Sequence, residues 1–174
     1  MKNITLVLGT AREDNKSRRV LLALEKELAN KTSNLEIVDI KDHVLSPVTT
    51  PPWGQGGADT VPTKWKEIAG KTDTFIFILP EYNHGYPGEW KILMDSLYAE
   101  YAGKDVYLAG VSKGTFAGVR VVEHVQPVLH MFGLVLKNPT LYVGDVESSL
   151  DETGKILNDK LKERVEEFTN LIIS

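Results

Sequence analysis

Hydrophobic and polar residues alternate along the chain in blocks that predict short strands separated by amphipathic helices. The apolar runs typical of strands cover residues 4–8, 35–40, 74–79 and 106–111, with a broken fifth run at 134–136 and 141–143. The third and fourth runs are apolar on both faces, which is typical of strands buried in a parallel sheet. The pattern therefore favours a parallel sheet covered on both sides.

Helical patterns fill the intervals between these runs. In the first, Val20, Leu21, Leu24 and Leu28 recur at helical spacing, and the pattern ends at Asn30. Further helices are predicted over 63–69, over 89–101, from the turn at 112–115 to Met131, and over the C-terminal 157–171. Five strands alternating with helices predict one doubly wound α/β domain over residues 1–174, because each parallel crossover needs a covering helix.

Ligands of doubly wound sheets bind at the carboxyl ends of strands, near the point where the strand order reverses. That rule selects three loops: 9–17 after the first strand, 80–88 after the third and 112–118 after the fourth. A fourth irregular segment, Leu45–Pro62, is crowded with proline and glycine, which exclude a regular helix or strand. We interpret it as a wall or lid of the site.

Composition and charge exclude several classes of protein. The 174 residues carry 20 Lys plus Arg against 24 Asp plus Glu, a formal net charge of −4, and no cysteine. Disulfides, thiolate zinc sites, iron–sulfur clusters and cysteine nucleophiles are thereby excluded. Without a dense basic block or an apolar run of about 18 residues, we expect neither a nucleic-acid partner nor a membrane span. The first residues lack the order of a signal peptide, so the expected location is the cytoplasm.

Side-chain catalysis is poorly supported by the sequence. The four histidines, His43, His84, His124 and His130, lack the spacing of a metal site, and no GxSxG nucleophile elbow is present. We therefore expect no metal and no catalytic side chain, with the chemistry carried by a bound cofactor.

The first loop holds the parts of an anion site: hydroxyls, backbone amides and guanidinium groups beside a helix N-terminus. It matches neither the Walker phosphate loop nor the GxGxxG fingerprint, so a monophosphate is favoured. The alternative is that Ser17 only caps the helix while the arginines are solvated.

The other two loops suit a flat ligand that approaches the backbone closely. Tyr82, His84 and Tyr86 in the second loop could stack on an aromatic ring or line its edge. The small residues of 112–118 would let a ligand approach the backbone closely. In the alternative interpretation, the second loop is a rigid connector and the third needs its glycines only for the turn.

Taken together, the three loops resemble the NADPH-dependent FMN reductase family, the flavodoxin-like group that includes quinone reductases and azoreductases. The matching residues are Gly9-Thr10 with Arg12 and Ser17; Pro80-Glu81-Tyr82-Asn83 followed by Pro87-Gly88, Lys91 and Asp95; and Ser112 with Gly114 and Gly118. The chain departs from the pattern at Ile92, where asparagine is common, and at Lys113.

The resemblance implies a flavodoxin-like five-stranded parallel sheet of order 2-1-3-4-5 with noncovalent FMN. It further implies two-electron transfer from NADPH or NADH to an acceptor, for which we expect quinones, azo compounds or free flavins. If both substrates share one site, the kinetics would be ping-pong. Thr10, Arg12, Ser17 and Arg18 would then hold the phosphate. The flavin ring would be contacted by Pro80, Glu81, Tyr82 and Asn83, with Ser112 and Gly114 at its other edge. From their positions in these loops, His84 and Lys113 are further candidate contacts. The alternatives are a flavodoxin-type electron carrier or flavin sensor without productive NAD(P)H turnover, and a phosphate-binding domain without flavin.

Two further expectations concern partners. The predicted helix after Gly88 carries more large apolar residues than one buried face needs, which predicts a homodimer or homotetramer. These residues are Trp90, Leu93, Met94, Leu97, Tyr98 and Tyr101. A site walled by Tyr82, His84, Tyr86 and Trp53 would accept planar small-molecule electron acceptors with little discrimination.

Overall fold

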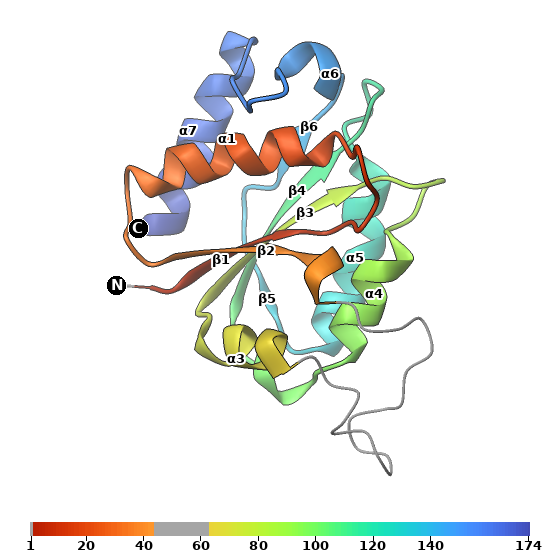
Figure 1. The fold of residues 1–174 in the computed structure, drawn as a ribbon, viewed down its shortest axis with the longest axis vertical. Coiled ribbons are helices and arrows are strands. Elements are labelled where there is room, and N and C mark those ends of the chain that lie inside the picture. The colour runs from red at the N-terminus through yellow and green to blue at the C-terminus, as the bar shows by residue number, and fades with distance from the viewer. Residues whose placement is uncertain (1, 44–62) are drawn as a thin grey trace.

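The computed structural model describes residues 2–43 and 63–174. The predicted wall at 45–62, with Trp53, lies outside the described residues. Within them, the chain forms a parallel sheet with helices on both faces (Figure 1). In this part of the chain, no helix is long and apolar enough to cross a bilayer.

The sheet has the predicted strand order. Over the described ranges it contains β1 (Ile4–Leu8), β2 (Leu35–Asp39), β3 (Thr74–Pro80), β4 (Asp105–Val111), β5 (Val135–Leu136) and β6 (Leu141–Val143). The order is β2-β1-β3-β4-β5, all pairs are parallel, and β6 also pairs with β4. The flavodoxin-like order is confirmed, and so is the break in the fifth strand.

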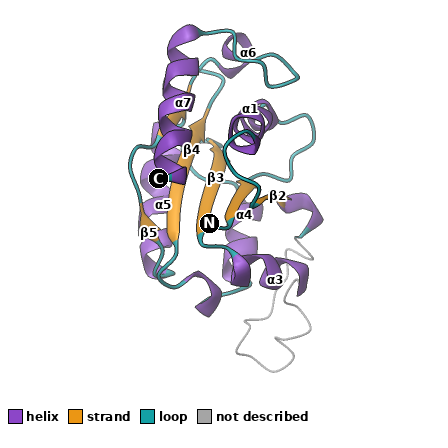
Figure 2. Ribbon diagram, turned by 90° about the vertical axis from the view of Figure 1, so that its left-hand side faces the viewer, coloured by secondary structure: helices purple, strands orange, loops and turns teal. Residues whose placement is uncertain are grey.

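Two hydrophobic cores lie on opposite faces of the sheet, because successive side chains of a strand point to opposite sides. Leu6 and Leu8 of β1 contact the core under α1 (Ser17–Ala29) and α7 (Asp159–Ile173). Val7 belongs to the other core. That core is covered by α3 (Thr63–Lys71), α4 (Gly88–Asp95) and α5 (Val119–Met131). Figure 2 shows the strands between these layers.

Three short elements complete the described chain: η1 (Ile40–Asp42), η2 (Ala99–Tyr101) and α6 (Val146–Ser149). The prediction of one helix over 89–101 is wrong, because α4 ends at Asp95 and η2 follows separately. The backbone N–H of Ser96 donates to the carbonyl of Leu93 at 3.2 Å, and the Ser96 hydroxyl donates to the same carbonyl at 2.6 Å. These short-range bonds tighten the last turn and end the helix.

The end of α4 overturns the sequence argument for a partner surface. Five of the six large side chains are buried within the chain itself: Trp90, Leu93, Met94, Leu97 and Tyr101. The Tyr101 hydroxyl accepts a hydrogen bond from Trp65 Nε1 at 2.9 Å, and burial raises the pKa of Tyr101. Because the chain turns after Asp95, these residues do not share one long helix with two apolar faces. Tyr98 alone among the six is exposed.

Candidate functional site

A pocket of about 380 Å³ lies at the carboxyl end of the sheet, where β1 and β3 adjoin and the strand order reverses. The loops that follow β1, β3 and β4 meet at this end, opposite the N-terminus (Figure 1). The pocket is lined by Arg12, Asp14, Asn15, Lys16, Ser17, Pro80, Glu81, Tyr82, Val111, Ser112, Lys113 and Val146. Each of the three loops selected from the sequence therefore contributes to one cavity. Its volume is within the ~300–1,000 Å³ typical of ligand and cofactor pockets.

The first loop presents an unused hydrogen-bond donor to this pocket. Ser17 Oγ is buried and has no hydrogen-bond partner among the described residues. It opens α1, whose N-cap residue, Lys16, makes no side-chain capping bond in the described chain. The residue before Lys16 caps the helix instead, because Asn15 Oδ1 accepts a hydrogen bond from the Arg18 backbone N–H at 3.0 Å. The helix dipole still favours an anion at this end of α1. A buried hydroxyl without a partner is costly unless a ligand satisfies it. This end of the pocket therefore fits a phosphate.

Arg12, in the first loop, contacts Tyr82 of the second loop. Its guanidinium carbon is 3.8 Å from the centroid of the Tyr82 ring, a cation–π contact. Both residues line the pocket. The contact places a permanent positive charge and an aromatic ring side by side at the pocket wall.

Two of the predicted phosphate ligands do not line the pocket. Thr10 is fully buried, and its hydroxyl bonds with Tyr82 Oη and Glu89 Oε1. The Arg18 guanidinium forms an ion pair with Asp39 at the end of β2. Their side chains are therefore occupied by protein partners, whereas Arg12 and Ser17 line the cavity.

In the second loop too, some of the predicted ligands line the pocket and others do not. Pro80, Glu81 and Tyr82 line the pocket. The carboxylate of Glu81 accepts hydrogen bonds from the side chain and backbone N–H of Arg120, at 3.0 and 3.2 Å, and so anchors the loop to α5. Asn83 and His84 are exposed at a tight turn and do not line the pocket.

The turn at the tip of the second loop explains where Asn83 and His84 lie. Tyr82 and Gly85 exchange two backbone hydrogen bonds of 2.9 Å, and the two residues between them have positive φ. Tyr86 packs edge-on against Trp90, with ring centroids 5.3 Å apart, and so faces the core. Of the predicted aromatic wall within the described residues, only Tyr82 lines the pocket.

The third loop contributes Ser112 and Lys113 to the lining, whereas Gly114 stays outside it. Ser112 Oγ donates to the Gly114 carbonyl at 2.6 Å, which holds the loop in its turn. Lys16 Nζ and Lys113 Nζ each lie 3.6 Å from Glu147 Oε1. An acidic residue thus stands between two lysines from different loops.

Sequence analysis missed several residues of this site. Val146 lines the pocket and Glu147 follows it in α6, a helix of four residues that is too short to show a periodic pattern. Glu89 was not singled out either, although an acidic residue in the first turn of a predicted helix is a recognisable signal. Only the fold shows that the Glu89 carboxylate bonds to the first loop.

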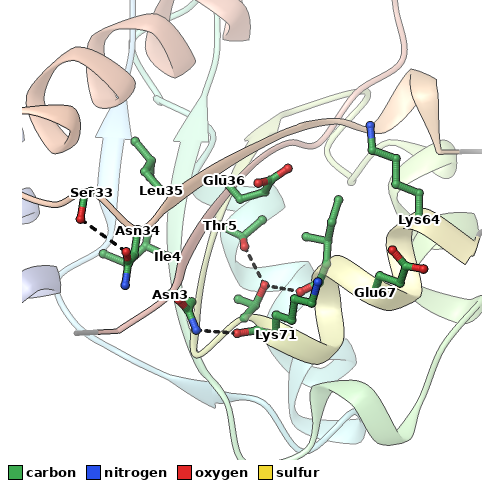
Figure 3. Close-up of a pocket in the computed structure, with 12 residues that line it drawn as sticks. Asn3, Ile4, Thr5, Ser33, Asn34, Leu35, Glu36, Lys64, Glu67 and Lys71 are labelled. Carbon is green, nitrogen blue, oxygen red and sulfur yellow. Dashed lines mark hydrogen bonds between the residues drawn. The ribbon is translucent and has the colours of Figure 1, made fainter.

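A larger pocket of about 430 Å³ lies at the opposite, amino end of the sheet (Figure 3). Glu36 and Glu67 line it together with Lys64 and Lys71, and a Thr5–Thr72 hydrogen bond of 2.6 Å lies beside them. It has no aromatic lining residue. The amino ends of strands are not where ligands of such sheets bind. The smaller pocket is therefore the better candidate for a cofactor.

The described residues contain no group of three or more His, Asp or Glu side chains that could hold a metal ion. The donors that line the smaller pocket instead suit a phosphate at one end and a flat ring beside Pro80 and Tyr82. The unpartnered Ser17 hydroxyl is the observation that fits FMN to this pocket.

Comparison with known proteins supports the same interpretation. The chain is 29% identical over 181 residues to a quinone reductase of Pseudomonas putida, covering 99% of this chain and 93% of that one. It is 25% identical over 174 residues to a 2-hydroxy-1,4-benzoquinone reductase of Burkholderia sp., covering 95% and 91%. The fold is similar to that of the flavoenzyme NAD(P)H:(acceptor) oxidoreductase of Paracoccus denitrificans. The TM-score is 0.79 at 21% identity, with 99% of this chain and 96% of the other covered.

A family model adds the decisive finding. The model described as NADPH-dependent FMN reductase matches residues 2–148, which include all three loops of the pocket. The chain therefore belongs to the NADPH-dependent FMN reductase family.

Proposed function

We propose that this protein passes two electrons from NAD(P)H, through FMN held in the pocket at the carboxyl end of the sheet, to quinone, azo or free-flavin acceptors. Family membership confirms the enzyme class and the cofactors: an oxidoreductase that uses FMN and NAD(P)H. The observation that carries the assignment to this pocket is the buried, unpartnered Ser17 hydroxyl at the start of α1, in the same pocket as Arg12 and Tyr82.

The residues of the pocket would bind and orient FMN. Ser17 Oγ would donate to the phosphate at the start of α1, and Arg12 would balance its charge. Pro80 and Tyr82 would form the wall beside the flavin ring. FMN supplies the hydride chemistry when bound, so the protein contributes orientation and exclusion of water.

The acceptor range is supported by the relatives and by the pocket. The Pseudomonas putida relative is named a quinone reductase, and the Burkholderia relative is named for a benzoquinone. Contacts between stacked rings differ by only about 1 kcal/mol, so a flat site discriminates weakly among planar acceptors. NAD(P)H and the acceptor would use the same face in turn, which gives ping-pong kinetics.

We expect steady-state assays to show parallel lines in double-reciprocal plots of rate against NADPH at several quinone concentrations. A panel of quinones, an azo dye, ferricyanide and free FMN should include several substrates. The purified protein should be yellow, and NADPH should bleach it without oxygen. Protein stripped of FMN is the control. Turnover of one acceptor alone, or intersecting lines, would contradict the proposed mechanism, and a yellow protein that NAD(P)H cannot reduce would indicate an electron carrier or sensor.

We also propose a homo-oligomer, supported by a different surface from the one predicted. Tyr98 and Met131 are 48% and 68% exposed and lie together, with the Tyr98 hydroxyl donating to the Met131 carbonyl at 3.4 Å. Tyrosine and methionine are enriched at subunit interfaces.

Light scattering at micromolar concentration should therefore report at least twice the 19.4 kDa mass of the chain. Replacing Met131 by glutamate should shift the protein toward the monomer, because it places a charge in the buried contact. Leu157→Glu, at another exposed apolar position, is the matched control. A monomeric wild type at this concentration would exclude the oligomer.

A further inference from the structure

Glu89, in the first turn of α4, is bonded to the first loop, 78 residues earlier in the chain. Its Oε1 atom accepts hydrogen bonds from the backbone N–H of Ala11 and from the hydroxyl of Thr10, each at 3.0 Å. Hydrogen bonds to a charged acceptor are stronger than neutral ones. This single carboxylate oxygen therefore ties the first loop to the helix that follows the second loop.

Thr10 transmits this tie to the pocket. Its hydroxyl donates its only proton to Glu89, so the 2.8 Å bond between Thr10 Oγ1 and Tyr82 Oη must have Tyr82 as the donor. The backbone N–H of Arg12 also donates to Thr10 Oγ1, at 3.2 Å. The hydroxyl thus makes one bond as donor and two as acceptor, which is its full capacity. In this arrangement it has nothing left for a phosphate oxygen.

The two groups that donate to Thr10 belong to the residues that form the pocket wall. Tyr82 and Arg12 both line the pocket, and they contact each other through the cation–π interaction of 3.8 Å. Fixing the Tyr82 hydroxyl fixes the direction and reach of its ring, and the Arg12 guanidinium over the ring face restrains its plane. Fixing the Arg12 N–H fixes the backbone from which the guanidinium extends.

Stabilisation of the helix dipole does not by itself explain the hydrogen bonds of Glu89. An acidic residue in the first turn is favourable to a helix dipole wherever its side chain points. Here Pro87 occupies the N-cap without a side-chain bond, and the carboxylate bonds to a different segment of the chain. Thr10, the centre of the network, is fully buried, so its hydroxyl is shielded from water.

We propose that Glu89 is a positioning residue, which holds Tyr82 and the first loop in the geometry that FMN binding requires, with Thr10 as the link. The inference deepens the proposed function and rests on it. It assigns Thr10 a structural connection between loops, while Ser17 and Arg12 remain the side chains available to the phosphate.

The network is tested first in the protein without FMN. We expect Glu89→Ala to speed hydrogen exchange of the Ala11 amide and to shift the NMR signals of the Arg12 amide and the Tyr82 ring. Glu89→Gln should restore them largely, because an amide oxygen can also accept two hydrogen bonds. Asp95→Ala removes another carboxylate of α4, one that pairs with Lys91 at 2.7 Å, and serves as the matched control. Unchanged Ala11, Arg12 and Tyr82 signals in Glu89→Ala would overturn the proposal.

The effect on the cofactor is then measured by FMN titration at a temperature where every variant is folded. Glu89→Ala should weaken FMN affinity about tenfold, whereas Glu89→Gln and Asp95→Ala should stay within about threefold of wild type. Because the effect of Glu89 passes through the Tyr82 hydroxyl, Tyr82→Phe should weaken binding too. The double variant should then lose less than the product of the two single losses.

Each result separates the positioning role from other roles. Unchanged FMN affinity in Glu89→Ala, with a lowered melting temperature, would show a structural tie without a positioning role. A double variant whose loss equals the product of the single losses would break the proposed route through Tyr82. If the wild type bound no FMN, the proposed function would fail, and the Tyr82 ring signals of the FMN-free protein would still decide whether Glu89 positions that ring.

Discussion

Replacing Arg12 by alanine should weaken FMN binding by about 1.5–3 kcal/mol, roughly 10- to 150-fold, because a charge-assisted bond to the phosphate is lost. Riboflavin lacks the phosphate and should bind the variant and the wild type about equally. Any loss of packing between Arg12 and the Tyr82 ring affects both ligands, so the difference between them isolates the phosphate contact. Fluorescence titration with each ligand measures both affinities.

Arg18→Ala is the matched control for this experiment. The Arg18 guanidinium pairs with Asp39 and does not line the pocket, so its removal should weaken FMN binding much less. If Arg18→Ala weakened FMN binding as much as Arg12→Ala, Arg18 would have to leave Asp39 and bind the phosphate. The family resemblance implies such a phosphate contact for Arg18. Equal losses of FMN and riboflavin affinity in Arg12→Ala would show that Arg12 does not contact the phosphate.

Replacing Gly118 by alanine should lower the free energy of unfolding by about 2–4 kcal/mol. Gly118 has φ of +75° at the start of α5, and an added Cβ would lie 2.6 Å from the backbone nitrogen of Val111. The strain of the left-handed conformation and the clash with a buried strand add together. Thermal unfolding should show a melting temperature lower by about 5–15 °C.

Gly114, in the same loop, provides the comparison. An added Cβ there meets nothing within 4 Å, so Gly114→Ala should change stability by no more than about 0.5 kcal/mol. A melting temperature of Gly118→Ala equal to that of Gly114→Ala would contradict the packing argument. The two results together test whether the glycines of the third loop serve the fold, as the alternative interpretation of this loop supposed.

Local patterns in the sequence were sufficient for the layered architecture. The run Phe75–Leu79 is apolar on both faces, which favours a buried strand, and β3 is indeed buried at every position. The carboxyl-end rule then selected the loops of the pocket without coordinates. The strand order needed the family resemblance, because several orders bury the same apolar runs.

The direction of individual side chains was decided by the tertiary structure. Ser17 and Arg18 are neighbours in the sequence and both suit a phosphate, yet one lines the pocket and the other pairs with Asp39 on β2. Neighbouring helical residues point about 100° apart, so only the packing of α1 on the sheet determines which one faces the pocket.

The tertiary structure also decided where α4 ends and which groups the Thr10 hydroxyl binds. Apolar residues continue past Asp95 in a helical pattern, but the bonds of Ser96 to Leu93 end the helix. Thr10 has the composition of a phosphate ligand, and only the approach of Tyr82 and Glu89 shows that its hydroxyl is already saturated. The sequence by itself determined the three loops that form most of the site. The tertiary structure decided which of their side chains are free to bind, because hydrogen-bond partners more than 70 residues apart are set by the packing of the whole sheet.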